Sequence, residues 1–345
     1  MIKAAFFDTH PYDKEAFSAA LSSHKGVEIH YFETKLGADT VSLARGYDCV
    51  VVFVNDTVDG TVLNALHEMG ISLVALRCAG YNNVDIQSAY GKVHIVRVPA
   101  YSPHAVAEHA MAMLLTSVRR IHKAYNRTRD FNFTLNGFVG FDLYGKTVGI
   151  IGTGKIGRTF AEICRGFGMH VLAYDPYPAA DAGLCYVDLA TLFEKSDILS
   201  LHCPLTKDTY HLVNAKSIAQ MKKGAVLINT SRGALIDAEA LIDGIKQKII
   251  SAACLDVYEE ESDLFFEDFS GHIVQDDTIA RLLSLPNVIL TAHQAFLTKD
   301  ALGAIAETTL ANIEEYFAGK PLQNEICYRC EKKESCKKER PSRCF

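Results

Sequence analysis

Three glycines in the segment GKTVGIIGTGKIGRTF have the spacing of a phosphate-binding loop. Gly152, Gly154 and Gly157 form G-x-G-x-x-G directly after an apolar run of strand length and at the start of a helical stretch. The first two permit a tight turn and a close approach of the backbone to a pyrophosphate, and the third permits close helix packing. The N–H groups and positive dipole end of the helix then favour phosphate oxygens. The segment therefore predicts a dinucleotide-binding loop.

A carboxylate follows at the position that a nicotinamide dinucleotide needs. The next strand-like run ends in LAYDP, where Asp175 lies eighteen residues after Gly157. At the tip of that strand it can accept hydrogen bonds from both ribose hydroxyls. The alternative is a plain glycine turn followed by a helix-capping Asp. We predict NAD and not NADP, because Asp175 would repel a 2′-phosphate and no Arg follows it directly.

Polar or special residues recur at the ends of the later apolar runs DILSLH, AVLIN, ISAACL and NVILTA. The carboxyl ends of parallel strands share one edge of a sheet, and ligands bind at that edge in open α/β sheets. A lone His there would more commonly be structural, but several such residues together indicate a site. They are Cys203, Pro204, Thr230, Ser231, Arg232, Asp256 and His293.

The elements that would position these residues form two sets. Apolar runs of strand length alternate with longer amphipathic stretches, first from IKAAFFD to HIVRV and then from KTVGIIG to NVILTAH. A long helical stretch from about Pro103 to Arg129 lies between them. The pattern predicts an α/β protein with two doubly wound parallel-sheet domains, and the 345 residues exceed what one core usually organises.

Composition and charge exclude several classes of function. A chain with 49% hydrophobic and 22% charged residues is typical of soluble globular proteins. The net charge of −6 argues against nucleic-acid or membrane partners. The first apolar run meets Asp8 before a signal-peptide core could form, and no apolar run could span a bilayer. We therefore expect a cytoplasmic protein whose body cysteines are reduced and buried.

Seven segments of the chain resemble the NAD-dependent D-2-hydroxyacid dehydrogenases, and most closely the fermentative D-lactate dehydrogenases. The resemblance covers about residues 1 to 325, with the motifs in family order. It implies a Rossmann NAD domain over 101–296, inserted into a flavodoxin-like substrate domain over 1–100 and 297–326. It also implies a homo-oligomer, either dimer or tetramer. The segments are LRCAGYNNVD, VPAYSPHAVAEHA, GKTVGIIGTGKIG, LHCPLT, INTSRGALID, LDVYEEESDLFFED and TAHQAFLT.

By this resemblance the catalytic residues are Arg232, Glu261 and His293. Reduction of a 2-keto acid leaves negative charge on oxygen, which a positioned acid such as His293 can neutralise. Glu261 beside the imidazole would orient the ring and favour its protonated form. Arg232 can bind the substrate carboxylate through two hydrogen bonds. The choice of Glu261 over Glu259 and Glu260 depends on the family spacing alone.

The resemblance also assigns the binding residues. Substrate contacts are expected from Cys78, Ala79, Gly80, Tyr101, Arg232 and Phe296. Cofactor contacts are expected from Gly152, Thr153, Gly154, Lys155, Ile156, Gly157, Asp175, Pro176, Cys203, Pro204, Thr230, Ser231, Asp256 and His293. Asp256 would hold the nicotinamide amide. We interpret His202 as structural and His109 as a packing or interdomain contact.

Three functions remain open from the sequence. The first is reversible, NADH-dependent reduction of pyruvate to D-lactate, and the second is the same reaction on a bulkier 2-keto acid. They differ in pocket size, and Tyr81, Tyr101 and Phe296 would leave little room. The third is an NAD-responsive regulatory binding protein on a dehydrogenase fold. Retention of the Arg, Glu and His motifs together favours an enzyme.

The last nineteen residues, 327–345, differ in composition from the rest. They contain seven Lys or Arg against three Glu, and four cysteines, Cys327, Cys330, Cys336 and Cys344. The C-x2-C-x5-C-x7-C spacing is compatible with zinc or a four-thiolate iron–sulfur cluster, but it matches no zinc-finger pattern closely. A redox-sensitive tail or an inert ending are the alternatives. We expect any such site to be separate from catalysis.

Overall fold

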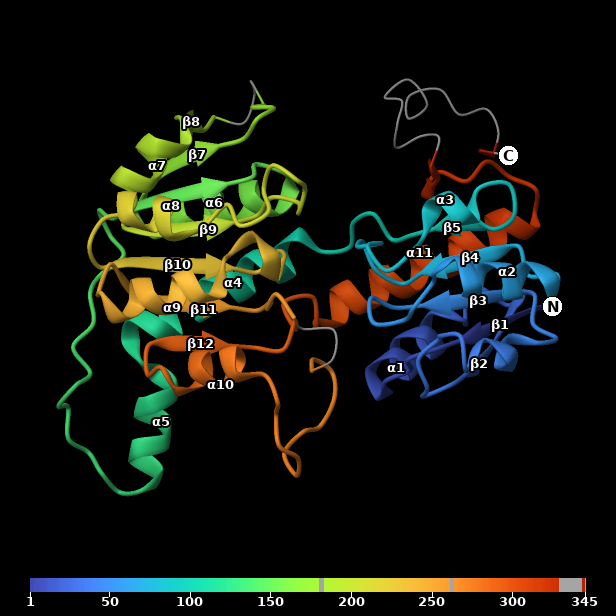
Figure 1. Ribbon diagram of the computed structural model, residues 1–345, viewed down its shortest axis with the longest axis horizontal. Helices are drawn as coiled ribbons and strands as arrows, with labels where there is room; N and C mark the ends of the chain where they lie inside the picture. The colour runs from blue at the N-terminus through green and yellow to red at the C-terminus, as the bar shows by residue number, and fades with distance from the viewer. Residues whose placement is uncertain (180–182, 261–263, 329–342, 345) are drawn as a thin grey trace. The chain divides into compact units, whose positions relative to one another are not determined.

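The structure of the chain is a computed structural model that describes residues 1–179, 183–260, 264–328, 343 and 344. The chain divides into two compact units (Figure 1). The first unit contains Met1–Ser102 and the segment that begins at Leu297, and the second contains Pro103–Phe296. The predicted α/β fold with two parallel-strand sheets is confirmed. The catalytic and cofactor roles assigned to the two parts stay predictions at this point.

The first unit is built on a six-stranded sheet of order β13-β5-β4-β3-β1-β2. Its first five strands are parallel, and β13 pairs antiparallel with β5. The strands are β1 (Ile2–Phe6), β2 (Val27–Tyr31), β3 (Cys49–Val52), β4 (Leu73–Leu76), β5 (His94–Val96) and β13 (Glu325–Ile326). The helices are α1 (Pro11–Ala20), η1 (Val41–Ala44), α2 (Gly60–Glu68), α3 (Ile86–Ala89) and α11 (Lys299–Phe317).

The second unit is built on a seven-stranded parallel sheet of order β12-β11-β10-β9-β6-β7-β8. The strands are β6 (Thr147–Ile151), β7 (His170–Tyr174), β8 (Cys185–Tyr186), β9 (Ile198–Leu201), β10 (Ala225–Asn229), β11 (Ile250–Leu255) and β12 (Val288–Leu290). The helices are α4 (Pro103–Arg119), α5 (Ile121–Arg129), α6 (Lys155–Gly166), α7 (Leu189–Lys195), α8 (Ala215–Gln220), η2 (Gly233–Leu235), α9 (Ala238–Lys246) and α10 (Asp277–Ser284).

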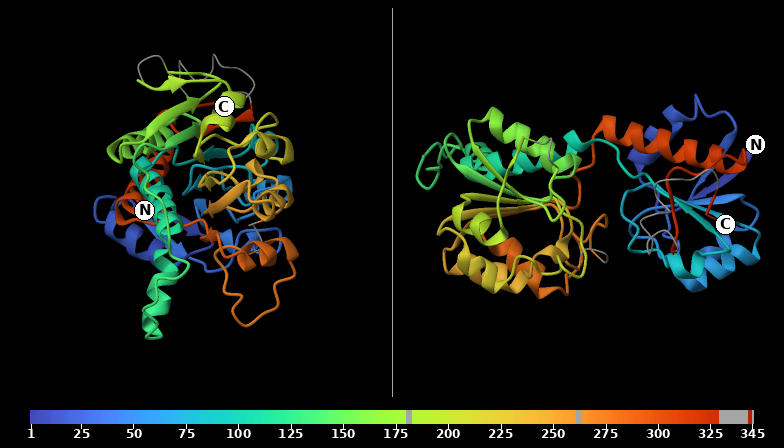
Figure 2. Two further views of the ribbon diagram at one scale, coloured as in Figure 1. Left: turned by 90° about the vertical axis from the view of Figure 1, so that its left-hand side faces the viewer. Right: turned by 90° about the horizontal axis from the view of Figure 1, so that it is seen from above.

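Helices cover both faces of this sheet (Figure 2). The strand sequences ILSL and AVLIN are accordingly buried along their whole length. The long helical stretch expected from Pro103 to Arg129 is divided in two. Arg120 has a φ of 52°, a left-handed conformation that ends α4 and begins α5. Among the described residues, no helix combines the length and apolar character needed to cross a bilayer.

The strands of the second unit end in register, and this alignment determines where the functional side chains lie. Ile151 pairs with Tyr174 on one side and with Leu201 on the other. Asn229 pairs with both Leu201 and Leu255, and Leu255 with Leu290. The next residue of each strand therefore falls in one row along the carboxyl edge of the sheet. The row consists of Asp175, Gly152, His202, Thr230, Asp256 and Thr291.

Candidate active site

The glycine loop after β6 is shaped by close backbone contacts. Gly152 has a φ of 93°, and a Cβ on it would lie 2.6 Å from the carbonyl of His202. A Cβ on Gly157 would lie 2.0 Å from the Gly152 carbonyl oxygen. Gly154, by contrast, has no atom within 4 Å of its Cβ position. The loop therefore packs tightly against the protein on one side and leaves space beside Gly154, at the N-cap of α6.

Asp175 ties the tip of β7 to the glycine loop. Its Oδ2 accepts hydrogen bonds from the Thr153 amide at 2.7 Å and the Thr153 hydroxyl at 3.0 Å, and its Oδ1 accepts from the Tyr177 amide at 2.9 Å. Tyr186 donates its hydroxyl hydrogen to Thr153 Oγ1. The carboxylate is thus held beside the loop, and its contact with a ribose stays a prediction.

The remaining predicted cofactor residues lie along the same edge of the sheet. Lys155 and Ile156 begin α6, Pro176 follows Asp175, Cys203 and Pro204 follow β9, and Thr230 and Ser231 follow β10. His202 is partly buried, and the desolvation of its ring lowers its pKa to about 4, so the ring is neutral. Its Nε2 lies 2.8 Å from Ser200 Oγ, which fits the structural role expected for it.

These features fit a dinucleotide. The open space beside Gly154 at a helix N-terminus suits a pyrophosphate, and Asp175 suits a ribose diol. Thr230 Oγ1 is buried and has no hydrogen-bond partner among the described residues. A buried hydroxyl at this edge can be satisfied by a polar ligand. The geometry is therefore compatible with the predicted NAD.

Arg232 is presented by a turn that Asn229 stabilises. Asn229 is fully buried, donates from Nδ2 to the Arg232 carbonyl at 2.8 Å and accepts from the Ser231 amide at 3.0 Å. A Cβ on Gly233 would lie 2.0 Å from the Tyr258 carbonyl carbon, so only Gly allows this turn to lie against that segment. Asn229 was not singled out from the sequence, although a buried Asn at the end of an apolar strand was a usable signal.

A buried carboxylate organises the segment that contains His293. Asp256 is 0% exposed, and its carboxylate accepts from the Thr291 hydroxyl at 2.5 Å and from the Gln294 and Ala295 amides at 2.9 Å. The His293 amide donates to the Asp256 carbonyl at 2.8 Å. His293 itself has a φ of 50° and remains partly exposed. The described partners make Asp256 the anchor of the 291–295 segment, a role that sequence reasoning missed.

The three consecutive glutamates have different surroundings. Glu259 Oε1 lies 2.8 Å from His211 Nε2 and accepts from the Tyr210 hydroxyl at 3.2 Å, whereas Glu260 is exposed. Glu261 lies outside the described residues, so its predicted place beside His293 stays a prediction. The pairing of Glu259 within the second unit gives that residue a structural explanation.

The predicted substrate segment Cys78–Gly80 follows β4 in the first unit. Arg97 donates from Nη1 to the Ala79 carbonyl at 2.6 Å, and its guanidinium lies 5.0 Å from the centre of the Tyr81 ring. The Cys78 thiol donates to the Gly80 carbonyl at 3.3 Å. Arg97 therefore supports the shape of this segment, and its position after a strand in VRVP did not reveal that role.

The other two predicted substrate residues belong to different units. Tyr101 is half-buried near the end of the first stretch of the first unit, and Phe296 is the last residue of the second unit and 8% exposed. Their predicted contacts with substrate stay predictions.

The cysteine tail is described only in part. Cys327 is buried and Cys344 is partly exposed, while Cys330 and Cys336 lie outside the described residues. The Cys344 amide donates to Glu325 Oε2 at 3.0 Å, and Glu325 Oε1 lies 2.6 Å from His94 Nδ1. Within the described ranges, no group of three or more His, Cys, Asp or Glu side chains could hold a metal ion.

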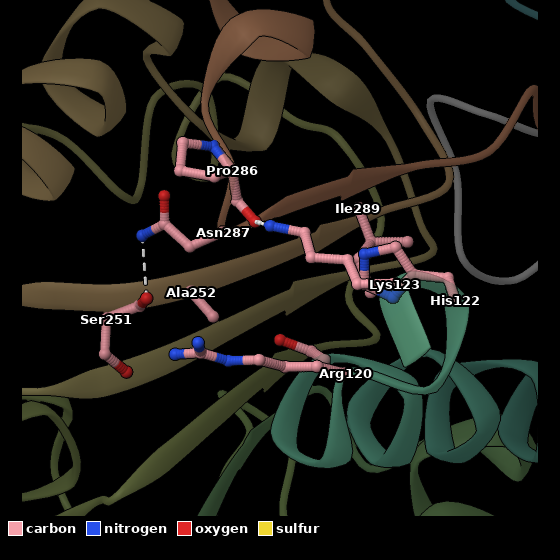
Figure 3. Close-up of a pocket in the computed structure, with 9 residues that line it drawn as sticks. Arg120, His122, Lys123, Ser251, Ala252, Pro286, Asn287 and Ile289 are labelled. Carbon is pink, nitrogen blue, oxygen red and sulfur yellow. Dashed lines mark hydrogen bonds between the residues drawn. The ribbon is translucent and has the colours of Figure 1, made fainter. Parts of the chain in front are cut away.

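A separate pocket lies at the opposite edge of the second sheet (Figure 3). It has a volume of about 130 Å³ and is lined by residues around the junction of α4 and α5, at the start of β11, and in and just before β12. Lys123 Nζ donates to the Pro286 carbonyl, and Asn287 Nδ2 donates to the Ser251 carbonyl at 2.7 Å. Because the strands are parallel, this pocket is far along each strand from the row that contains Gly152 and Asp256.

Replacement of Asp175 should change cofactor choice. Asp175→Asn removes the charge that opposes a 2′-phosphate but keeps acceptor and donor atoms near Thr153. We expect the ratio of NADPH to NADH dissociation constants to fall by about tenfold, which corresponds to ~1.4 kcal/mol. Titration by nucleotide fluorescence measures both constants, with the exposed Asp188→Asn as control. A wild type that already prefers NADPH would contradict the prediction.

Comparisons with known proteins agree with this geometry. Residues 111–295 match the family model "D-isomer specific 2-hydroxyacid dehydrogenase, NAD binding domain". The D-lactate dehydrogenase of Escherichia coli K12 is 50% identical over 329 residues, which cover 94% of this chain and 100% of the relative. The apo-structure of D-lactate dehydrogenase from E. coli has a TM-score of 0.87 at 47% identity and covers 94% and 100% of the two chains. The pyruvate reductase of Chlamydomonas reinhardtii has a TM-score of 0.89 at 42% identity and covers 93% and 98%. This chain therefore belongs to the NAD-dependent D-isomer specific 2-hydroxyacid dehydrogenases, the family that its motifs predicted.

Proposed function

We propose that this protein catalyses the reversible reduction of pyruvate to D-lactate with NADH. The observation on which this depends most is the row of aligned strand ends, which brings the turn of Arg232 and the anchor of His293 to the edge that holds the glycine loop. The name of one relative that is 50% identical, the D-lactate dehydrogenase of Escherichia coli K12, supports lactate as the product. A cytoplasmic location is part of the proposal.

In this proposal, the cofactor transfers the hydride, and residues of the chain bind the substrate and transfer the proton. The reduced cofactor, NADH, supplies the hydride when it is bound. Arg232 binds the carboxylate of the keto acid and polarises its carbonyl, because a planar guanidinium can offer two donors. His293 delivers a proton to the carbonyl oxygen, and Glu261 is proposed to orient its ring. The backbone of Cys78–Gly80, with Tyr101, completes the proposed substrate contacts.

A second candidate is the same reaction on a branched or aromatic 2-keto acid. The bulky side chains Tyr81, Tyr101 and Phe296 favour the smaller substrate if they line the pocket. The third candidate, an NAD-responsive regulatory protein, predicts cofactor binding without turnover. An assay with NADH and a panel of 2-keto acids separates all three, because they differ in which substrate, if any, is reduced.

Loss of the proton donor should affect turnover more than binding. We expect His293→Gln to lower kcat for pyruvate by at least about 100-fold and to remove the alkaline limb of the pH profile, with NADH affinity nearly unchanged. Arg232→Lys should lower kcat/KM, since an ammonium cannot reproduce the planar fork. His170→Gln, on an exposed residue at the start of β7, serves as the control. Near-normal turnover of His293→Gln would exclude that residue as the acid.

We also propose that the protein is a homo-oligomer that pairs through the segment after α5. Its side chains Phe131, Phe133, Leu135 and Val139 are 70–89% exposed. Arg127 nevertheless holds the backbone, donating to the Asn136 carbonyl at 2.9 Å with its guanidinium 4.0 Å from the centre of the Phe138 ring. An ordered segment that exposes this much apolar surface is typical of an interface.

Charges placed on this segment should separate the subunits. We expect the wild type to elute as a dimer or tetramer. The double variant Phe133→Asp, Leu135→Asp should elute as a monomer, because burying an unpaired carboxylate in the interface costs free energy. Light scattering after size exclusion measures the mass. Tyr177→Asp provides a control on an equally exposed aromatic residue of the same unit. A monomeric wild type would contradict the proposal.

A metal or redox site formed by Cys327, Cys330, Cys336 and Cys344 remains a separate proposal. A truncation after Tyr328 tests it while keeping β13, which an earlier truncation would remove. We expect zinc or iron in anaerobically purified full-length protein and its loss in the truncated protein, with basal turnover retained. Elemental analysis and a visible spectrum measure this. Absence of metal together with unchanged sensitivity to oxidants would exclude the site.

A further inference from the structure

His109 contacts the segment of the proton donor instead of serving only as packing. It lies on α4, which packs against β11 and β12 within the second unit. Its Nε2 is 3.2 Å from Thr291 Oγ1 and 3.4 Å from Asp256 Oδ1. The side chain is 19% exposed, and Asp256 is buried. Among the described residues, His109 is the one basic side chain within ion-pair distance of Asp256.

The hydrogen atoms of this group can be counted. Thr291 has a single hydroxyl hydrogen, and the 2.5 Å contact assigns it to Asp256 Oδ1. The lone pairs of that hydroxyl are then free to accept, so His109 Nε2 must carry a hydrogen and donate. A donating Nε2 also suits the nearby Asp256 Oδ1. The arrangement therefore orders the chain of donors from His109 to Thr291 to Asp256.

Asp256 connects these hydrogen bonds to the segment that contains His293. The same carboxylate accepts from the Gln294 and Ala295 amides, and the Asp256 carbonyl accepts from the His293 amide. The segment thus has contacts to one buried residue on both sides of His293. A left-handed backbone at His293, with its φ of 50°, persists only where the surroundings hold it.

We propose that His109 is a positioning residue for the proton donor. Its Nε2 hydrogen orients the Thr291 hydroxyl toward Asp256, and this keeps the Asp256 carboxylate and the 291–295 segment in the arrangement that places His293. His109 does not touch the substrate in this proposal. The inference rests on the proposed function, because it assigns His293 the role of acid.

Substitutions that keep or remove the donor test the proposal. His109→Leu removes the N–H, whereas His109→Gln keeps an N–H at similar reach. We expect His109→Leu to lower kcat for pyruvate by about 10- to 100-fold with KM within about twofold, because small displacements of a catalytic group are costly. His109→Gln should restore kcat to within about threefold of wild type. Equal losses in the two variants would overturn the proposal.

Substitutions of Thr291 provide a matched pair of variants and a double-mutant cycle with His109. Thr291→Ser keeps the hydroxyl and should be nearly wild type, whereas Thr291→Val should resemble His109→Leu. The double variant His109→Leu with Thr291→Val should lose no more than the larger single loss, since both act through one chain of hydrogen bonds. If the fold-loss in kcat of the double variant equals the product of the two single losses, the two residues act independently, and the proposed chain of hydrogen bonds is contradicted. Thermal unfolding of each variant separates these changes from general destabilisation.

A spectroscopic measurement is independent of turnover. In ¹⁵N-labelled wild type, the ring signals of His109 should report a protonated Nε2, and Thr291→Val should weaken that preference. A neutral ring protonated only at Nδ1 would overturn the proposal. If the wild type reduces no 2-keto acid, the proposed function fails. The ring signals of His293 then decide the positioning role, because His109→Leu should shift them and His109→Gln should not.

Discussion

The alignment of strand ends in the second unit is the constraint on which the candidate site depends. Parallel pairing fixes the register of six neighbouring strands, and the last paired residues Tyr174, Ile151, Leu201, Asn229, Leu255 and Leu290 form one line. Residues separated by more than a hundred positions in the chain consequently become neighbours along an edge. Strand register alone therefore brings together the Asp175 carboxylate, the glycine loop, the Arg232 turn and the His293 segment. Other contacts must fix the local conformation of each.

Polar side chains at the site and behind it supply that shape. Asn229 holds the turn of Arg232, Asp256 holds the segment of His293, and Asp175 holds the glycine loop. Asn229 and Asp256 are buried, and they satisfy backbone groups that would otherwise lack partners in a low-dielectric interior, which is costly. Asp175 does the same for the Thr153 amide from a partly exposed position. In the first unit, Arg97 has the same relation to Ala79. The residues expected to perform chemistry are therefore outnumbered by residues that position them.

The sequence predicted the fold and the location of the site for identifiable reasons. Alternating apolar runs and the glycine spacing are local signals, so the α/β class, the NAD loop and the polar strand ends followed from short segments. The partners of Asp256 could not be predicted in this way. Thr291 and His109 are 182 positions apart, and only strand register and the packing of α4 bring them together. The break at Arg120 was missed because a left-handed Arg leaves no mark in the pattern of apolar residues.

The shortest strand of the first unit has a consequence for solubility. β13 contributes two residues, yet it pairs antiparallel with β5 and covers that edge of an otherwise parallel sheet. The amide of Arg97 extends this cover by donating to the Asn324 carbonyl at 3.1 Å. An uncovered edge strand offers its N–H and C=O groups to strands of other molecules. A chain that lost Glu325 and Ile326 would keep every residue expected to react. It would nevertheless aggregate, because the exposed edge of β5 could pair with strands of other molecules.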